Sequence, residues 1–300
     1  MPIIALFLIA LAAGLLIGLA FDRLAPAQGA TAAAADALET AAEGVVVRSW
    51  WQMRVDPAAA TGLALTAALA LFIAGGTVVA VLAYLVRGNA TLASIDSSAA
   101  AWGHDHATHA STRALTWVTD LGDWALFPIG IAILLLELRR VPNRFLVPFA
   151  LVVVLGDKLI TNVIKQLADR ARPTLNPAAA ALGPSFPSGH SSTAAACYAG
   201  LALLLARGRS PRARALLAGG AGGIAIGVAA SRVLLDVHWL SDVIAGLMLG
   251  WAWFALCAIA FGGRRVHFAE PIEQAESAVE AAPPPPPART ARTGSPPAEV

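Results

Sequence analysis

The sequence predicts an all-α integral membrane protein. Charged residues make up 13 % of the 300-residue chain, apolar residues 57 %, and the mean hydropathy is +0.67. An average soluble domain is about 25 % charged, so this chain lacks the charge that would coat a soluble surface. Its apolar stretches are continuous rather than alternating with period two, which favours membrane helices over a β-barrel.

The charge and cysteine content exclude further classes of protein. A net charge of +2 argues against a nucleic-acid binder, which needs a concentrated basic face. The only cysteines, Cys197 and Cys257, lie in apolar runs and lack zinc-ligand spacing. We expect buried, inert thiols and neither a disulfide framework nor a metal cofactor.

Several apolar runs are candidate membrane spans. Residues 62–86 contain no charge between Asp56 and Arg87, and the run is long enough to cross about 30 Å of hydrocarbon. The other candidates are 3–21, 124–138, 145–164, 191–206, 215–231 and 240–262. Their Ala, Gly and Leu content suits close helix packing in lipid.

Arginine placement predicts the orientation. Arginines cluster after run 124–138, in loop 207–214 and after residue 262, and all three places lie on one face if the intervening runs cross. That face is then cytoplasmic, as is the C-terminus, in an inner (plasma) membrane. Loops 87–123, 165–189 and 232–239 face outward, although Arg87 fits this orientation poorly.

The chain divides into four parts. Residues 1–21 are predicted to be an extra N-terminal membrane helix, or an uncleaved signal-like segment, and 22–61 an Ala-rich connector. Residues 62–262 form the main transmembrane domain. The tail, residues 263–300, is acidic and then proline-rich, and we expect it to be a disordered cytoplasmic extension.

The first polar cluster lies at the outward end of run 145–164. Lys165 and Arg172 are seven residues apart, so a continuous helix would project both from one face, about 10 Å apart. Pro173 then ends the regular structure. The alternative is that these cations only snorkel to the membrane edge.

The second cluster is Pro187-Ser188-Gly189-His190, directly before run 191–206. Ser188 and Gly189 are placed to start a helix, whose free N–H groups and positive dipole end attract an anion. His190 would stand at that anion site. A simple capping turn with an exposed histidine is the alternative.

The third cluster, residues 231–242, contains Ser231, Arg232, His238 and Asp242. The histidine and the aspartate are four residues apart, which makes them neighbours on a helical face. A carboxylate that accepts Nδ1–H leaves Nε2 as a directed nucleophile or base. A membrane-edge ion pair is the alternative.

Together the clusters supply three cations, a helix N-terminus and two histidines, one of them backed by a carboxylate. Phosphoryl transfer needs these groups: cations for the phosphate oxygens, an in-line nucleophile and an acid for the leaving oxygen. No cluster of acidic metal ligands accompanies them, so the cations must neutralise the phosphate charge.

In this order, the patterns Lys-x6-Arg-Pro, Pro-Ser-Gly-His and Ser-Arg-x5-His-x3-Asp resemble the type 2 phosphatidic acid phosphatase and vanadium haloperoxidase superfamily. The resemblance covers residues 62–262 and implies a six-helix transmembrane bundle with its site at the outer membrane face. It implies that His238 attacks phosphorus, that Asp242 orients it and that His190 protonates the leaving group. The implied phosphate-binding residues are Lys165, Arg172, Ser188, Gly189 and Arg232.

The resemblance implies a membrane lipid phosphatase that forms a phosphohistidine and needs no metal. Expected substrates are phosphatidic acid, phosphatidylglycerol phosphate or a polyprenyl diphosphate such as undecaprenyl diphosphate. A transferase that passes the phosphoryl group or headgroup to another acceptor is the alternative within this chemistry. A membrane transporter or structural protein is the alternative from another class. The sequence does not define the oligomeric state.

Two further features have alternative interpretations. His104, His106 and His109 resemble a cluster of metal ligands. Their spacing suits no single helix face, so a solvated loop is favoured over a metal site. Asp157 and Lys158 are predicted to form structural ion pairs, or Lys158 extends the cationic face of Lys165.

Overall fold

The computed structural model describes residues 59–140, 142–176, 179 and 182–262. The helices of this part are α4 (Ala59–Leu85), α5 (Ala90–Asp105), α6 (His109–Asp120), α7 (Leu126–Arg140), α8 (Leu146–Ala168), α9 (Gly189–Ala206), α10 (Pro211–Leu234) and α11 (Leu240–Gly262). The predicted helix 3–21, nearly all of the connector 22–61 and the tail 263–300 lie outside the described residues.

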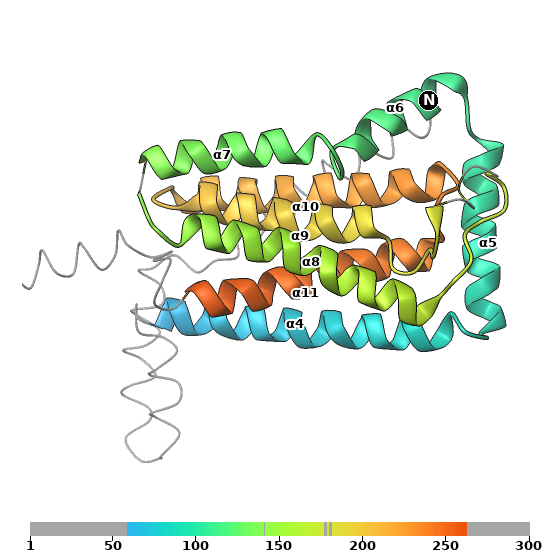
Figure 1. Cartoon of the computed structure of the whole chain (residues 1–300), viewed down its shortest axis with the longest axis horizontal. Coiled ribbons are helices and arrows are strands. Elements are labelled where there is room, and N and C mark those ends of the chain that lie inside the picture. Colours follow the sequence, from blue (N-terminus) through green and yellow to red (C-terminus); the bar gives the residue numbers. More distant parts are fainter. Residues whose placement is uncertain (1–58, 141, 177–178, 180–181, 263–300) are drawn as a thin grey trace, which may run out of the picture.

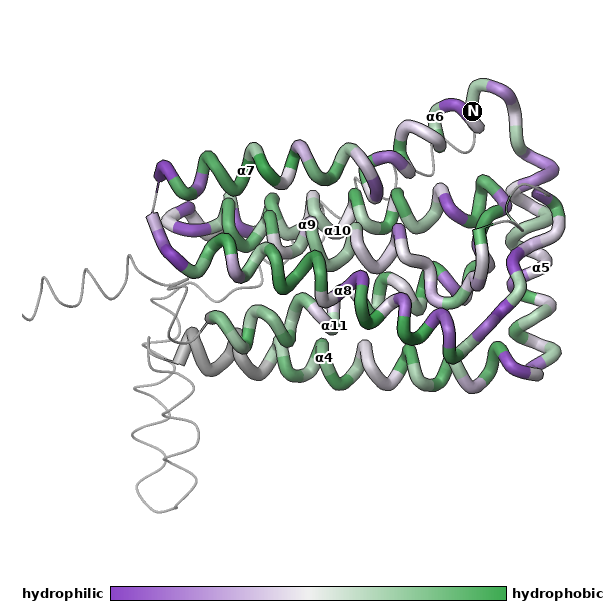
Figure 2. The backbone as a smooth tube through the Cα atoms, viewed as in Figure 1, coloured by the Kyte–Doolittle hydropathy of each residue, from purple (hydrophilic) through white to green (hydrophobic). Residues whose placement is uncertain are grey.

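The long helices run side by side and reverse direction from each one to the next along the chain, and α5 crosses one end of them (Figure 1). Hydrophobic residues follow most of their length, while hydrophilic residues gather toward the two ends (Figure 2). Within the part of the chain that the structure describes, four helices, α4, α8, α10 and α11, are long and apolar enough to cross a membrane. Each of the six runs predicted after residue 61 lies within a helix or extends past its ends by at most two residues, and the number that cross the membrane stays a prediction.

The region 87–123, expected as an outer loop, contains α5 and α6. Each helix begins at a polar cap: Asn89 accepts a hydrogen bond from the Leu92 N–H, and Thr108 forms a reciprocal capping box with Ser111. Neither helix has the long apolar run by which the membrane helices were recognised. The histidines of this region are exposed, as the prediction of a solvated segment requires, but they lie on and between helices instead of in a loop.

Helix α9 lies at the centre of the bundle and packs against α7, α8, α10 and α11. Its small residues allow neighbouring helices to come close, and Gly246 and Gly250 of α11 face its backbone. A Cβ added at Gly250 would overlap the Ser192 carbonyl and lie 2.8 Å from the Ala195 Cβ.

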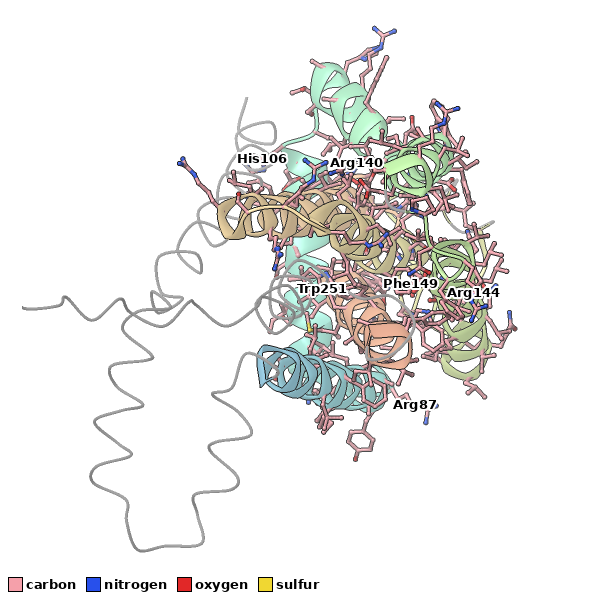
Figure 3. The ribbon with its side chains drawn as sticks, turned by 90° about the vertical axis from the view of Figure 1, so that its left-hand side faces the viewer. Arg87, His106, Arg140, Arg144, Phe149 and Trp251 are labelled. Atoms are coloured by element: carbon pink, nitrogen blue, oxygen red, sulfur yellow. The ribbon has the colours of Figure 1, made fainter. Side chains whose placement is uncertain are left out.

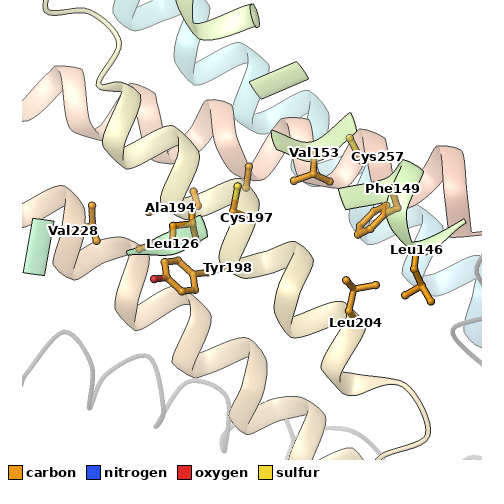
Figure 4. Close-up of a cluster of buried hydrophobic side chains, with 13 residues drawn as sticks. Leu126, Leu146, Phe149, Val153, Ala194, Cys197, Tyr198, Leu204, Val228 and Cys257 are labelled. Carbon is orange, nitrogen blue, oxygen red and sulfur yellow. The ribbon is translucent and has the colours of Figure 1, made fainter. Parts of the chain in front are cut away.

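Toward the other end of α9, larger side chains complete the core. Leu204 of α9 is buried with Leu146, Phe149 and Val153 of α8 (Figure 4). Figure 3 looks along the bundle from this end, where Arg140 and Arg144 flank the α7–α8 connection. The α9–α10 connection, with Arg207 and Arg209, lies at the same end because the helices alternate in direction. The arginine-rich loops therefore share one end, and its assignment to the cytoplasm stays a prediction.

Arg87, which fits the predicted orientation poorly, has a local partner. Its guanidinium donates to the Leu167 carbonyl, 3.4 Å away, in the last turn of α8. A cation beside the final carbonyls of a helix is stabilised by the negative end of the helix dipole.

Replacing Gly250 with alanine tests the close approach of α9 and α11. We expect Gly250→Ala to lower the free energy of unfolding by about 1–3 kcal/mol, because the added methyl group is overpacked. The matched control is Gly220→Ala in α10, where an added Cβ meets nothing within 4 Å; it should be neutral or stabilising. Thermal unfolding of the detergent-solubilised proteins measures both, and equal behaviour of the two variants would contradict this packing.

Candidate active site

The three polar clusters meet at the end of the bundle that α5 crosses. Lys165 is near the end of α8, Ser188 precedes α9, Arg232 is near the end of α10, and Asp242 is in the first turn of α11. Helices α8 to α11 alternate in direction along the chain, so the ends of α8 and α10 and the starts of α9 and α11 converge at one end, remote from the arginine-rich loops (Figure 1).

The first cluster assembles through a turn instead of a continuous helix. Helix α8 ends at Ala168, and Asp169 adopts a left-handed conformation with φ 41°, so the expected shared helical face of Lys165 and Arg172 is wrong. The two cations nevertheless meet at the Pro184 carbonyl, 2.8 Å from Lys165 Nζ and 3.3 Å from Arg172 Nη2. Arg172 Nε also donates to the Gly183 carbonyl at 2.8 Å.

The second cluster starts a helix as predicted, because α9 begins at Gly189 with Ser188 as its N-cap residue. The fully buried Ser188 donates its backbone N–H to the Asp242 carbonyl at 2.9 Å. A Cβ added at Gly189 would lie 3.9 Å from Lys165 Cε, so the first turn of α9 lies beside that lysine. His190 is partly exposed, with Nε2 3.6 Å from Asp123 Oδ2.

The third cluster places His238 just before α11 instead of on its face. The imidazole is 2 % exposed, with Nδ1 3.5 Å from Asp242 Oδ2. Asp242 Oδ2 also accepts the Trp239 N–H at 3.0 Å, which holds the carboxylate at the start of the helix.

The other imidazole nitrogen faces a cation. Nε2 of His238 is 3.1 Å from Arg172 Nη1, which also donates to the Val237 carbonyl at 2.7 Å. Arginine has no acceptor, so Nε2 must accept and the ring proton is assigned to Nδ1. This is the tautomer that leaves a lone pair on Nε2.

Arg232 is 8 % exposed and donates to Thr119 Oγ1 at 2.9 Å. Its Nε has no hydrogen-bond partner among the residues that the structure describes. Its charge acts on Lys165, His190 and His238, so these groups lie within electrostatic range of one another. A buried guanidinium with an unused donor is suited to an anion.

The surroundings keep His238 neutral near pH 7. Burial lowers the pKa of its imidazole to about 4, against the opposing effect of Asp242, and the charges of Arg172 and Arg232 lower it further. Burial also lowers the pKa of the Arg172 guanidinium, which nevertheless stays a cation at neutral pH. The site thus combines a neutral, buried imidazole with neighbouring cations.

This arrangement can be compared with known proteins. Residues 145–265 match the family model described as the PAP2 superfamily. The resemblance to this superfamily is confirmed. The matched segment, called the PAP2 region below, contains Lys165, Arg172, His190, Arg232 and His238.

Curated relatives and a solved structure agree with this match. The chain is 37 % identical over 102 residues to a phosphatidylglycerophosphatase B of Bacillus subtilis, an alignment of 33 % of this chain and 50 % of the relative. It is 39 % identical over 113 residues to a lipid A 1-phosphatase of Rhizobium etli, covering 34 % of this chain and 44 % of the relative. The chain thus spans about half the length of the curated relatives it matches.

The solved structure is the first transmembrane PAP2-type phosphatidylglycerolphosphate phosphatase, from Bacillus subtilis. It superposes with a TM-score of 0.57 and 29 % identity, covering 63 % of this chain and 93 % of that one. The fold match therefore extends beyond the PAP2 region itself.

The sequence interpretation missed a buried network that anchors the PAP2 region to α5. Arg170 donates to Asp242 Oδ1 at 2.6 Å and to Asp96 Oδ2 at 2.7 Å. Ser241 completes it, because its N–H and hydroxyl both donate to Asp96, at 2.8 and 2.6 Å. Asp96, Ser241 and Asp242 are each at most 1 % exposed. The buried ion pairs of Arg170 with Asp96 and Asp242 therefore hold in place the carboxylate that faces His238.

The signal for this network was weak. Arg170 lies inside the unspecified spacing between Lys165 and Arg172, and Asp96 is a single carboxylate in an Ala- and Ser-rich stretch. Asp123, beside His190, was missed for the same reason. Only the fold brings these residues to the site.

The two remaining sequence features also have defined partners. His104 Nδ1 is 3.0 Å from Asp236 Oδ2, and His106 stacks on Trp102. No group of three His, Cys, Asp or Glu side chains suited to a metal occurs within the described part of the chain. Asp157 accepts hydrogen bonds from the Ser192 and Thr193 hydroxyls instead of the predicted ion pair.

Removing Arg170 tests the network. We expect Arg170→Ala to lower the free energy of unfolding by about 3–5 kcal/mol, because it leaves the buried carboxylates of Asp96 and Asp242 unpaired. Arg172→Ala is the matched control and should cost less, since the protein groups that Arg172 binds are backbone carbonyls and an imidazole. Thermal unfolding in detergent measures both variants. A larger loss from Arg172→Ala would overturn the ranking.

Proposed function

We propose that this protein is a membrane lipid phosphatase that hydrolyses a phosphomonoester or diphosphate of a lipid through a phosphohistidine. The observation that carries the proposal is the buried, neutral imidazole of His238, whose Nε2 faces Arg172 at 3.1 Å. A nucleophile held beside a fixed cation can attack a phosphoryl group whose oxygens that cation binds. The names of the relatives support the same class of reaction.

In the proposed first step, Nε2 of His238 attacks phosphorus and the bond to the leaving oxygen breaks. The Nδ1 proton stays on the ring, and the positive charge that develops is stabilised by the Asp242 carboxylate 3.5 Å away. Burial and the charge of Arg232 lower the pKa of His190 to about 3 before substrate binds, so in this step His190 first takes up a proton as the bound phosphate dianion offsets the neighbouring cations, and then donates that proton to the leaving oxygen. In the second step, water loses a proton to His190 and attacks phosphorus, which releases inorganic phosphate and restores neutral His238.

The phosphate oxygens need positive partners throughout. Lys165, Arg172 and Arg232 supply them, and Ser188 and the Gly189 amide complete the cradle at the start of α9. Two of these cations donate to backbone carbonyls of residues 182–184, bonds that a phosphate can replace. Because the charges are already in place, little reorganisation is needed when charge develops in the transition state.

A lipid substrate is supported by the position of the site at the end of an apolar bundle. The headgroup can enter the cationic site while its chains stay in the bilayer. Phosphatidic acid, phosphatidylglycerol phosphate and polyprenyl diphosphates such as undecaprenyl diphosphate all have this shape. We propose that the site faces the outer side of the inner membrane, with the arginine-rich loops in the cytoplasm. Transfer of the phosphoryl group or headgroup to an alcohol uses the same phosphohistidine and is the second candidate.

Substitution of the histidines tests the reaction. We expect His238→Ala and His190→Ala to lower phosphate release from a lipid phosphate by about 10³-fold or more, because they remove the nucleophile and the acid. Asp242→Asn should retain more activity, since it leaves the nucleophile in place. The measurement is inorganic phosphate released by the purified, detergent-solubilised protein, with EDTA present.

The controls separate this proposal from its alternatives. Vanadate, which mimics pentacoordinate phosphorus, should inhibit the wild type, and chelator should not. Wild-type activity in His238→Ala would refute the assigned nucleophile. No phosphate release from any lipid by the wild type would favour the transporter or structural alternative, while a phosphorylated alcohol as product would favour the transferase.

The pH dependence tests the environment of His238. With its pKa near 4, the imidazole stays neutral well below pH 6.5, so its protonation should reduce kcat/KM only below about pH 5. Asp242 raises this pKa, so Asp242→Asn should move the acid limb to still lower pH while reducing the plateau. The profile is corrected for the separately measured ionisation of the substrate phosphate. An acid limb near pH 6.5, with kcat/KM falling as the pH is lowered through that value, would contradict a buried nucleophile.

A further inference from the structure

A cavity of about 170 Å³ adjoins the site on the side of His190 and extends along α8. Its lining comes from α8, the start of α9 and the α6–α7 connection. The lining residues are Gly122, Asp123, Lys158, Thr161, Asn162, Lys165, Gly189, His190 and Thr193. The cavity therefore joins the proposed phosphate cradle to a part of the protein to which no role has been assigned.

Lys158 lies at the far end of this cavity. It is two helical turns before Lys165 on the same face of α8, about 10 Å farther from the site end of the bundle. The chain contains only these two lysines, and both line the cavity. A helix continuous between them keeps their separation fixed.

Lys158 is a cation without a paired carboxylate among the described residues. Its neighbour Asp157 is buried and occupied by the Ser192 and Thr193 hydroxyls. Asp123, which also lines the cavity, lies 3.6 Å from His190 Nε2. The contact recorded for the Lys158 ammonium is with the Phe127 ring, whose centroid is 5.6 Å away. A charge at membrane depth is costly unless it is paired or serves a ligand.

An apolar groove continues from this point. It has a volume of about 320 Å³ and lies among α7, α8 and α9, with Phe127 in its lining. Phe127 thus contacts the Lys158 ammonium and also borders the groove. Along the bundle from the site, a bound molecule would meet the cationic cradle first, then Lys158 and then the apolar groove.

Some lipid phosphates carry matching groups in the same order: a terminal phosphate, a second phosphate and then apolar chains. The phosphate at the tip of the headgroup enters the site, and any second phosphate lies nearer to the apolar chains and therefore deeper in the bilayer. We propose that Lys158, with Asn162, binds a second phosphate group of the lipid substrate, the one nearer its chains. This inference rests on the proposed phosphatase function and assigns the substrate class to lipids with two phosphates in one headgroup.

Two kinds of lipid carry such a pair. In a diphosphate, the second phosphate is bonded directly to the first through oxygen; in a glycerol-linked headgroup, three carbons separate a phosphomonoester from a phosphodiester. Both present an anion to Lys158, and a substrate panel distinguishes them. Phosphatidic acid has one phosphate and lacks this contact.

The experiment measures kcat/KM of the full-length, detergent-solubilised protein on four lipids. Phosphatidylglycerophosphate is compared with phosphatidic acid of the same acyl chains, and a polyprenyl diphosphate with its monophosphate. We expect Lys158→Met to lower kcat/KM about tenfold or more on at least one two-phosphate lipid, the loss of one charge-assisted hydrogen bond. On the monophosphates the change should be less than about threefold. The more affected pair identifies the headgroup.

Two further variants and thermal unfolding guard the result. Lys158→Arg keeps the charge and should retain most of the preference for two phosphates, whereas Arg113→Met removes an exposed cation of α6 outside the cavity and should change no ratio. The inference would be overturned if Lys158→Met unfolds at the wild-type temperature and loses kcat/KM equally on monophosphates and on two-phosphate lipids. That result would leave the phosphatase function intact. Failure of the wild type to hydrolyse any of the four lipids would instead refute the function on which it rests.

Discussion

The hydrogen bond from the Ser188 N–H to the Asp242 carbonyl joins the second and third motifs directly, and the rest of the site depends on it. It can form because Gly246 has no side chain: a Cβ there would lie 2.5 Å from the Ser188 carbonyl oxygen. The start of α9 is thereby brought against the start of α11, so the free N–H groups of one helix lie beside His238. This close helix crossing therefore sets the distance between the proposed nucleophile, His238, and the proposed anion cradle at the start of α9.

Most of the fold follows from local patterns. The apolar runs predicted each helix from α4 onward except α5 and α6, since length and hydropathy are properties of short windows. Helices α5 and α6 have polar sequences, and their stability comes from caps and from contacts with α10 and α11. A short stretch of sequence gives no sign of such long-range contacts. The end of α8 was misjudged for a related reason. The left-handed Asp169 redirects the chain before Arg172, and nothing in the Lys-x6-Arg spacing signals that turn.

The site divides in the same way. Lys165, His190, Arg232 and His238 could be named from the sequence because each belongs to a short motif, and the structure brings them together. Arg170, Asp96 and Asp123 could not, because their importance lies in long-range contacts. Arg170 joins α5 to α11 across more than seventy residues of chain in either direction. Such a bridge is a consequence of the fold, so it becomes visible only after the helices are assembled.

The cations of the site repel one another. Lys165, Arg172 and Arg232 lie within range of one another's repulsion and are partly or wholly removed from water. Backbone carbonyls of Gly183, Pro184 and Val237 offset part of this cost, but they are neutral dipoles. In the proposed reaction, a phosphate dianion would replace them with full negative charge, so its binding would relieve the repulsion and also satisfy the unused donor of Arg232. The buried Asp96–Arg170–Asp242 network keeps its own charges balanced and apart from this exchange. The framework can therefore stay rigid while the cradle changes partners, which is the condition for fixed charges to act on a transition state.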